Sequence, residues 1–343
     1  MNNISYHKQK EILNQEKLAE ILSMLPDFVS DFFISIENNS SSLTRLNYAY
    51  DIRTFFEYFA TKIGKKINEI TLENLEDVKS RDIERFLSYV SMYEKDGKIV
   101  TNKERGKARK LSALRSFFKY LFNNDLISSN VITKISTPKI HQKEIIRLEV
   151  DEVVKLLNQA ENPTNLTKRE QSYNQITSLR DLAILSVFLG TGIRISELVG
   201  LDIKDIDFNN NSFKITRKGG NEVVLYFSDE VKEALLNWLE ERKDIKTLEE
   251  NDDALFLSLQ KKRITPRAVE NLVKKYAQAI APLKKISPHK LRSTYGTNLY
   301  RETQDIYVVA DVLGHKDVNT TKKHYAAISE DIRRNASTRI KLR

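Results

Sequence analysis

The chain has 343 residues, of which 40% are hydrophobic and 30% are charged, and its formal net charge is +9. This length suits two domains, and the apolar content is sufficient for two cores. The absence of cysteine excludes disulfides, thiolate metal sites and a cysteine nucleophile. No apolar run approaches a membrane span, and the N-terminus lacks the apolar region of a signal peptide. We therefore expect a cytoplasmic protein with an anionic partner and no membrane association.

The first part of the chain shows helical spacing of apolar residues and no strand alternation. Helices are predicted over residues 14–25, 43–61, 80–93, 101–122 and, more briefly, 127–132. The aromatic residues of 43–61 recur on one stripe, which favours core packing over a platform for stacking bases. The pattern predicts a small all-α domain over residues 1–137.

The stretch from Lys98 to Lys119 is strongly basic, with eight lysines and arginines against one acid, Glu104. On a helix over 101–122, these basic residues are expected to lie opposite the apolar stripe. Such a face can neutralise DNA phosphates or can simply be solvated, and both readings stay open. The candidate phosphate contacts are Lys103, Arg105, Lys107, Arg109, Lys110 and Arg115.

The segment 138–147, PKIHQKEIIR, is the predicted linker, because it is basic, contains a proline and has little apolar content. The second domain, 148–343, combines apolar helical periodicity with one strand pattern. Helices are predicted over 148–161, 178–192, 228–243 and 265–280, and a polar loop over 162–174. The pattern of residues 211–227 predicts two short strands around a turn at Gly219 and Gly220. The fold class expected is mainly α with a small β-sheet.

Six side chains of the second domain together have the chemistry needed to cleave a phosphodiester. They are Arg194, Lys218, His289, Arg292, His315 and Tyr325. Two arginine forks can grip the non-bridging oxygens of a phosphate, while a lysine and two histidines can donate hydrogen bonds and move protons. A tyrosine can be the covalent nucleophile. The sequence offers no carboxylate cluster for a two-metal site and no phosphate-binding loop for a nucleotide.

The local contexts of the first two residues suit these tasks. Arg194 follows a Gly-Thr-Gly turn and begins an apolar helix, where a desolvated guanidinium needs an anion. A salt bridge to Glu197 or Asp202 is the structural alternative. Lys218 lies at the predicted hairpin tip, where the glycines allow the backbone to approach DNA, and Arg217 competes for the same task.

The remaining contexts lie toward the C-terminus. His289 and Arg292 form an H-x-x-R pair at helical spacing, and Pro288 suits the first turn of their helix, whose start also favours an anion. His315 lies in LGH, and Tyr325 follows it by ten residues. The two arginines and the lysine would lower the pKa of a tyrosine, which is ordinarily near 10. A packed helical tyrosine is the alternative.

This set resembles the tyrosine recombinases, also called the phage-integrase superfamily, from about Ser41 to the C-terminus. GTGIRISELVGL, RKGGN, SPHKLRSTYGTNLY and LGHKDVNTTKKHY carry the resemblance, which is closest to the Xer-like branch that uses a single recombinase. It implies an N-terminal core-binding (SAM-like) domain, a C-terminal mixed α/β catalytic domain and a 3′-phosphotyrosyl intermediate on Tyr325. It also implies a reaction without metal or cofactor.

The resemblance assigns a role to each residue of the set. Arg194 and Arg292 become the phosphate clamps, with Glu197 as a supporting acid. Lys218 protonates the leaving 5′ oxygen, and His289 acts as an acid/base or phosphate donor. His315 occupies the histidine position of the LGH signature. Among the basic residues, Arg217 is expected to contact DNA.

The family also implies partners: duplex DNA with inverted half-sites, a homodimer on that DNA and a homotetramer in the synaptic complex. Chromosome dimer resolution is the expected role, because no long arm-binding domain precedes the helical one. Integration or excision of a mobile element and inversion of a promoter remain alternatives. The intact six-residue set argues against a non-catalytic DNA-binding protein. A type IB topoisomerase shares the chemistry, but the two-domain length and the LGH motif fit a recombinase better.

Overall fold

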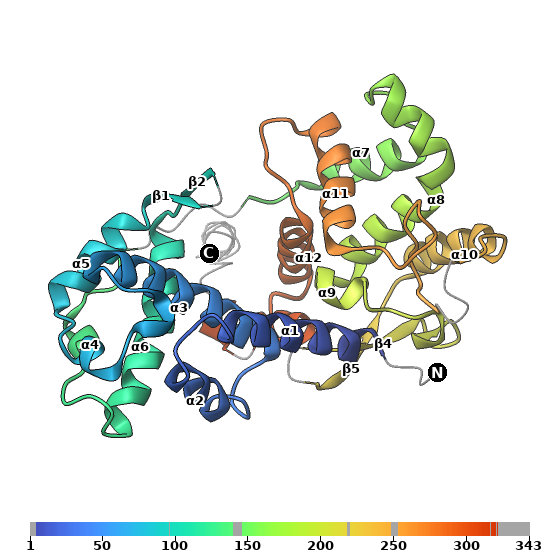
Figure 1. Ribbon diagram of the computed structural model, residues 1–343. Helices are drawn as coiled ribbons and strands as arrows, with labels where there is room; N and C mark the ends of the chain where they lie inside the picture. The colour runs from blue at the N-terminus through green and yellow to red at the C-terminus, as the bar shows by residue number, and fades with distance from the viewer. Residues whose placement is uncertain are drawn as a thin grey trace, which may run out of the picture. The chain divides into compact units, whose positions relative to one another are not determined.

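The computed structural model describes residues 5–95, 97–139, 146–217, 220–247, 253–315, 317–319 and 321. The chain divides into two compact units, Met1–Lys143 and Glu144–Arg343 (Figure 1). The predicted linker at 138–147 falls partly on residues outside the described ranges. Among the described helices, none combines the length and the apolarity that crossing a membrane would require.

The first unit is a helical bundle around an aromatic core. Its helices are α1 (Tyr6–Leu22), α2 (Phe28–Ser35), α3 (Ser42–Ile63), α4 (Leu72–Glu76), α5 (Ser80–Tyr89) and α6 (Glu104–Asn123), with 3₁₀ turns η1 (Ile67–Glu69) and η2 (Val131–Lys134). Phe55 of α3 and Phe118 of α6 are fully buried, with ring centroids 6.0 Å apart. Core packing of the aromatic stripe is thus confirmed, because this contact buries rings that a base-stacking surface would expose.

The expectation of an all-α first domain is wrong in one place. Strands β1 (Met92–Lys95) and β2 (Lys98–Thr101) form an antiparallel hairpin directly after α5, so the predicted helix 80–93 ends early. Asp-Gly at positions 96 and 97 is a two-residue hairpin signal, and Gly97 has φ of +71°. Met92 and Ile99 are exposed, by 68% and 74%, whereas Tyr93 and Val100 are partly buried. Each face of the hairpin mixes apolar with charged side chains, so the sequence shows no apolar–polar alternation, which explains the missed prediction.

Other elements also differ from the predictions. The short helix expected at 127–132 is not formed; the 3₁₀ turn η2 overlaps only its last two residues. Helices α2 and α4 were not predicted. The predicted loop 162–174 is partly helical, because the next helix already begins at Lys168. Thr167 caps that helix: its hydroxyl accepts from the Glu170 N–H at 3.3 Å while the Glu170 carboxylate accepts from the Thr167 N–H at 3.0 Å.

The second unit packs its helices around one long central helix. The helices are α7 (Val150–Glu161), α8 (Lys168–Thr191), α9 (Ile195–Leu198), α10 (Asp229–Lys243), α11 (Pro266–Ile280), α12 (Pro288–Thr303) and α13 (Ile306–Leu313), with a 3₁₀ turn η3 (Ile203–Asp205). Helix α8 contacts α7, α10 and α12. Its C-terminal half is apolar and buried, which explains its central place.

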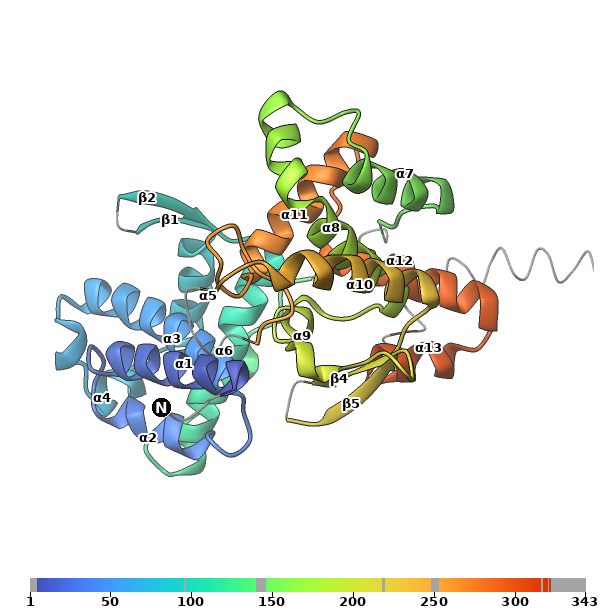
Figure 2. The ribbon, with the colours of Figure 1, turned by 90° about the vertical axis from the view of Figure 1, so that its right-hand side faces the viewer.

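A small antiparallel sheet completes the second unit. Strands β3 (Ile206–Asp207), β4 (Ser212–Thr216) and β5 (Glu222–Tyr226) pair in the order β3–β4–β5. The β4–β5 register joins Thr216 to Glu222, which confirms the hairpin predicted around the two glycines. Figure 2 shows this hairpin beside α13.

Two glycines in the left-handed conformation end α8 and α13. Gly192 has φ of +62° and Gly314 has φ of +59°, a region that side chains with a Cβ disfavour. A Cβ at Gly192 would overlap the Tyr295 ring, and a Cβ at Gly314 would overlap the Arg217 guanidinium. These two chain reversals place Arg194 and His315 immediately after the ends of their preceding helices.

Candidate active site

Arg194 precedes the first turn of α9 and is held by Glu197. Its N–H donates to Glu197 Oε2 at 2.9 Å, and its Nη1 donates to Glu197 Oε1 at 2.8 Å. Arg194 therefore forms the salt bridge that was the alternative to anion binding, and its partner is Glu197. Asp202 instead pairs with Arg263 at 2.6 Å. The Arg194 side chain remains 34% exposed. The salt bridge orients this guanidinium without enclosing it.

The same guanidinium also reaches the end of α13. Arg194 Nη2 donates to the carbonyl oxygens of Leu313, at 3.2 Å, and Gly314, at 3.0 Å. The last carbonyls of a helix have no partner within the helix and carry the negative end of its dipole. A cation is therefore stabilised at this position, and its direction is fixed by backbone atoms.

Arg292, on α12, is 5% exposed and converges on the same place. It donates to the carbonyl oxygens of Gly192 and Leu313. The Leu313 carbonyl thus accepts from both Arg194 and Arg292, which come from elements far apart in sequence. The structure brings together the two residues predicted to clamp a phosphate.

A third guanidinium lies at the same helix end. Arg217, which follows β4, donates from Nη2 to the Val312 carbonyl at 2.8 Å, and its Nη1 lies 3.5 Å from the Asp311 carbonyl. Burial lowers the pKa of Arg217, an effect that the charge of Arg194 increases and that of Glu197 opposes. In this structure its terminal nitrogens face α13, and the expectation that Arg217 contacts DNA stays a prediction.

The two predicted histidines come from two different elements, α12 and the residue after the C-cap of α13. His315 is half-buried after α13; its N–H donates to the Ala310 carbonyl at 2.9 Å, and its Nδ1 lies 2.7 Å from Thr321 Oγ1. His289 lies exposed in the first turn of α12, one turn before Arg292. No pattern in the sequence pointed to Thr321, a buried threonine that orients the His315 ring.

Lys218 and Tyr325 lie outside the described residues, so both assignments stay predictions. The chain on either side of Lys218 is described. Arg217 N–H donates to the Asn221 carbonyl at 2.8 Å, and Gly220 N–H donates to the Arg217 carbonyl at 3.1 Å. Gly220 has φ of +84°. These bonds close the hairpin tip that Lys218 was predicted to occupy.

The basic helix of the first unit requires a correction at Lys110. Lys110 is 5% exposed, and its Nζ lies 2.9 Å from Asp51 Oδ1, a carboxylate that is fully buried. Arg109 Nη1 lies 2.6 Å from Asp51 Oδ2. Burial raises the pKa of Asp51, and the charges of Lys110 and Arg109 oppose that effect. Lys110 compensates a buried charge inside the domain. Its burial contradicts the prediction that Lys110 contacts a DNA phosphate.

The other candidates on α6 divide into two groups. Lys103 and Arg105 are exposed and Lys107 is partly exposed, so all three remain accessible to a phosphate backbone. Arg115 instead donates to the Thr137 hydroxyl at 2.7 Å and to the Ile135 carbonyl, joining α6 to the segment after η2. Arg115 is therefore a bracing residue in this structure.

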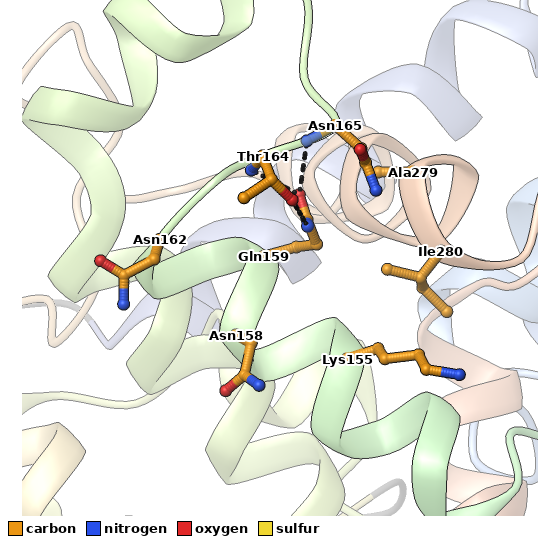
Figure 3. Close-up of a pocket in the computed structure, with 8 residues that line it drawn as sticks. All are labelled: Lys155, Asn158, Gln159, Asn162, Thr164, Asn165, Ala279 and Ile280. Carbon is orange, nitrogen blue, oxygen red and sulfur yellow. Dashed lines mark hydrogen bonds between the residues drawn. The ribbon is translucent and has the colours of Figure 1, made fainter.

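A polar cleft of about 570 Å³ lies between α7, the loop after it and the end of α11 (Figure 3). Its lining residues are Lys155, Asn158, Gln159, Asn162, Thr164, Asn165, Ala279 and Ile280. The Gln159 amide donates to the Thr164 hydroxyl at 2.6 Å and accepts from the backbone of Thr164 and Asn165. Of the predicted catalytic residues that the structure describes, none lines this cleft, and its central amide is already hydrogen-bonded.

Comparison with known families gives two matches. The phage integrase family matches residues 146–331, and the N-terminal SAM-like domain of phage integrases matches residues 29–124. The chain is 33% identical over 300 residues to tyrosine recombinase XerC of Thermodesulfovibrio yellowstonii, with 86% of this chain and 90% of that protein covered. It is 33% identical over 357 residues to tyrosine recombinase XerS of Streptococcus agalactiae serotype III, covering 95% and 99%.

Solved structures share the fold at lower identity. XerH site-specific recombinase, in a post-cleavage complex with palindromic difH substrate, has a TM-score of 0.65 at 21% identity, with 90% of this chain and 85% of that chain covered. The Tn1549 transposon integrase, in complex with transposon right end DNA, has a TM-score of 0.63 at 19% identity, covering 90% and 99%. Both structure neighbours are recombinases bound to DNA.

Proposed function

This chain belongs to the phage integrase family of tyrosine recombinases, and from that premise we propose which of its side chains cleave DNA. It is a Xer-like site-specific recombinase that breaks and rejoins DNA strands. The proposed catalytic set is Arg194, Lys218, His289, Arg292, His315 and the nucleophile Tyr325. The observation that carries this proposal is the meeting of Arg194 and Arg292 at the Leu313 carbonyl.

The arginine pair suits a transition state that gains negative charge. The cluster carries an excess of positive charge. It contains three guanidiniums and one buried carboxylate, which belong to Arg194, Arg217, Arg292 and Glu197. A pentacoordinate phosphorane offsets this excess charge. Backbone carbonyls hold both clamp arginines before DNA arrives, so little reorganisation accompanies the reaction.

The proposed chemistry transfers a phosphodiester to the enzyme. The Tyr325 hydroxyl gives its proton to His289 and its oxygen attacks the phosphorus. The bond to the 5′ oxygen breaks, and Lys218 gives that oxygen a proton. The products are a 3′-phosphotyrosyl linkage and a free 5′-hydroxyl. Attack by the 5′-hydroxyl of another strand reverses the step and rejoins the DNA. The Thr321 hydroxyl would orient the His315 ring for a hydrogen bond to the phosphate.

The matching experiment traps the covalent linkage. A duplex carrying the target site and a nick beside the scissile phosphate releases a short fragment, so rejoining is blocked and the adduct accumulates. Peptide mapping should place the nucleotide on Tyr325, and Tyr325→Phe should bind DNA but form no adduct. Tyr307→Phe, an exposed tyrosine on α13, is the matched control. An adduct that persists in Tyr325→Phe would refute this nucleophile.

The proposed biological role is resolution of chromosome dimers in the cytoplasm by a single recombinase. Two protomers would occupy inverted half-sites and four would form the synaptic complex, with the first unit contacting DNA as a core-type binding domain. Alignment with XerS over 95% of the chain supports this role. The purified protein alone should resolve a plasmid dimer carrying two copies of its site. A strong preference for joining a separate circle to a target would instead indicate mobile-element integration.

A further inference from the structure

Arg217 occupies a position that joins two parts of the second unit. Its backbone closes the β4–β5 hairpin: the Arg217 N–H donates to the Asn221 carbonyl, and the Arg217 carbonyl accepts from the Gly220 N–H. The conformation of this residue therefore sets where the hairpin tip begins. Lys218 is the next residue in the chain.

The Arg217 side chain extends from the hairpin to the last turn of α13. Nη2 donates to the Val312 carbonyl at 2.8 Å, and Nη1 lies 3.5 Å from the Asp311 carbonyl. Gly314 leaves the space that the guanidinium fills, because a Cβ at that position would overlap Arg217 Nη1. The side chain is thus seated between two carbonyls and a glycine.

The position of the Arg217 side chain leaves one of its hydrogen-bond donors unsatisfied. Arg217 Nε is buried and has no hydrogen-bond partner among the described residues. An unsatisfied donor on a charged group opposes folding, so this contact is a poor choice for stability alone. A role in placing the hairpin accounts for an arginine here, because only a long forked side chain reaches both carbonyls.

We propose that Arg217 is a positioning residue, which fastens the β4–β5 hairpin to the turn of α13 that also holds Arg194 and Arg292. The proposal rests on the function proposed above, in which Lys218 protonates the leaving oxygen. Arg217 then acts through its neighbour: with Arg217 seated, the hairpin brings the general acid to the site where the arginines hold the phosphate. Arg217 itself needs no contact with DNA.

The test uses a leaving group that needs no proton. A sulfur in place of the bridging 5′ oxygen leaves as a thiolate, so a defect confined to the general acid disappears with that substrate. We expect Arg217→Gln to slow single-turnover cleavage of the oxygen substrate by about 10-fold or more. The sulfur substrate should restore cleavage to within a few-fold of the wild-type rate. Lys214→Gln, an exposed lysine on β4, is the matched control and should cleave both substrates normally.

Lys218→Ala separates the two hypotheses. If sulfur fails to rescue Lys218→Ala, the assignment of Lys218 as the acid is wrong. If sulfur rescues Lys218→Ala but not Arg217→Gln, the positioning role of Arg217 is overturned while the proposed function stands. A thermal melt of each variant identifies any that fail to fold, and Arg217→Lys then provides the second variant. It keeps the charge but loses the fork, so the same sulfur-dependent rescue is expected.

Gly314 provides an independent check through a double-mutant cycle. Gly314→Ala should displace the Arg217 side chain and slow cleavage in the wild-type background. In the Arg217→Ala background the guanidinium is absent, so the added methyl should have a several-fold smaller effect. The backbone strain at Gly314 is common to both backgrounds and cancels. Fully additive effects would overturn the steric link between Gly314 and Arg217.

A direct phosphate contact is the competing role for Arg217. It predicts weaker DNA binding and a salt dependence reduced by roughly 0.9 in the slope of log affinity against log salt. The positioning role predicts an unchanged slope and unchanged affinity in Arg217→Gln. A shallower slope together with normal cleavage by the bound complex would therefore overturn our proposal.

Discussion

Arg194 and Arg292 donate hydrogen bonds to the same acceptor, the carbonyl oxygen of Leu313. One residue precedes α9 and the other lies on α12, so the shared oxygen fixes the separation of two like charges. Each guanidinium has additional backbone acceptors, Gly314 for Arg194 and Gly192 for Arg292. The pair is therefore assembled by main-chain atoms.

Replacing either clamp arginine with lysine should slow cleavage by about 10²-fold or more. A lysine keeps the charge but is a single point donor, so it lacks the planar fork that holds both Leu313 and a phosphate. Single-turnover cleavage by Arg194→Lys and Arg292→Lys is the measurement. Arg267→Lys, an exposed arginine on α11, is the matched control. Near wild-type cleavage by a clamp variant would make that arginine structural.

Arg292→Lys should also lower stability, whereas Arg194→Lys should do so less. Arg292 is buried, and its loss leaves the Gly192 carbonyl without this donor, at a cost of about 1–3 kcal/mol. Arg194 is partly exposed, so water can replace its hydrogen bonds. Urea unfolding of the two variants measures the difference, and equal losses would contradict it.

Strand exchange should proceed in an excess of chelator. The proposed set supplies its positive charge from arginine and lysine and its nucleophile from tyrosine, and these side chains require no metal ion. Recombination measured with and without chelator, at constant ionic strength, tests this expectation. Loss of activity in chelator with recovery on adding magnesium would indicate a different chemistry.

The exposed basic residues before and within α6 should determine the salt dependence of DNA binding. Replacing Lys103, Arg105 and Lys107 with alanine should lower the slope of log affinity against log salt by roughly 0.9 for each lost phosphate contact. Specific and non-specific duplexes should be affected alike. An unchanged slope would identify these residues as a solvated face, the alternative that the sequence left open.

Lys110→Met should destabilise the first unit by about 3 kcal/mol, because it leaves the Asp51 carboxylate buried with Arg109 as its remaining ion-pair partner. The pKa of Asp51 is already raised in the folded protein, and removing Lys110 should raise it further. A carboxyl with a raised folded pKa binds its proton more tightly when folded, so stability is regained as pH falls through that pKa. Urea unfolding at neutral and acidic pH should show the deficit shrinking with acidification. A constant deficit would contradict this account.

The sequence predicted structure well where a local signal existed. The glycines after β4 predicted the hairpin, and the apolar stripe of α6 predicted its buried face. The same stripe also includes a charged residue: Lys110 lies at helical spacing with Leu114, Phe117 and Leu121, on the buried face. A charged residue within such a spacing points to a buried partner, here Asp51.

The meeting of the arginines had no such signal. Arg194, Arg217 and Arg292 are nearly a hundred residues apart at the extremes, and their acceptors are backbone carbonyls. Every residue, proline included, offers a backbone carbonyl, so no residue type marks the acceptors in the sequence. The resemblance predicted that two of these arginines share a task, but the helix end that holds them became visible only in three dimensions.

The use of main-chain acceptors at the end of α13 has a consequence for mutational tolerance. The side chain of Asp311 is exposed, and that of Val312 is partly exposed, so replacements there leave the carbonyls that hold Arg217 in place. The sequence can therefore vary at these two positions, whereas Gly314 and the arginines cannot be replaced. In a saturation scan scored by recombination, two permissive positions would therefore lie within three residues of an intolerant glycine, although all of them belong to one arginine-binding turn.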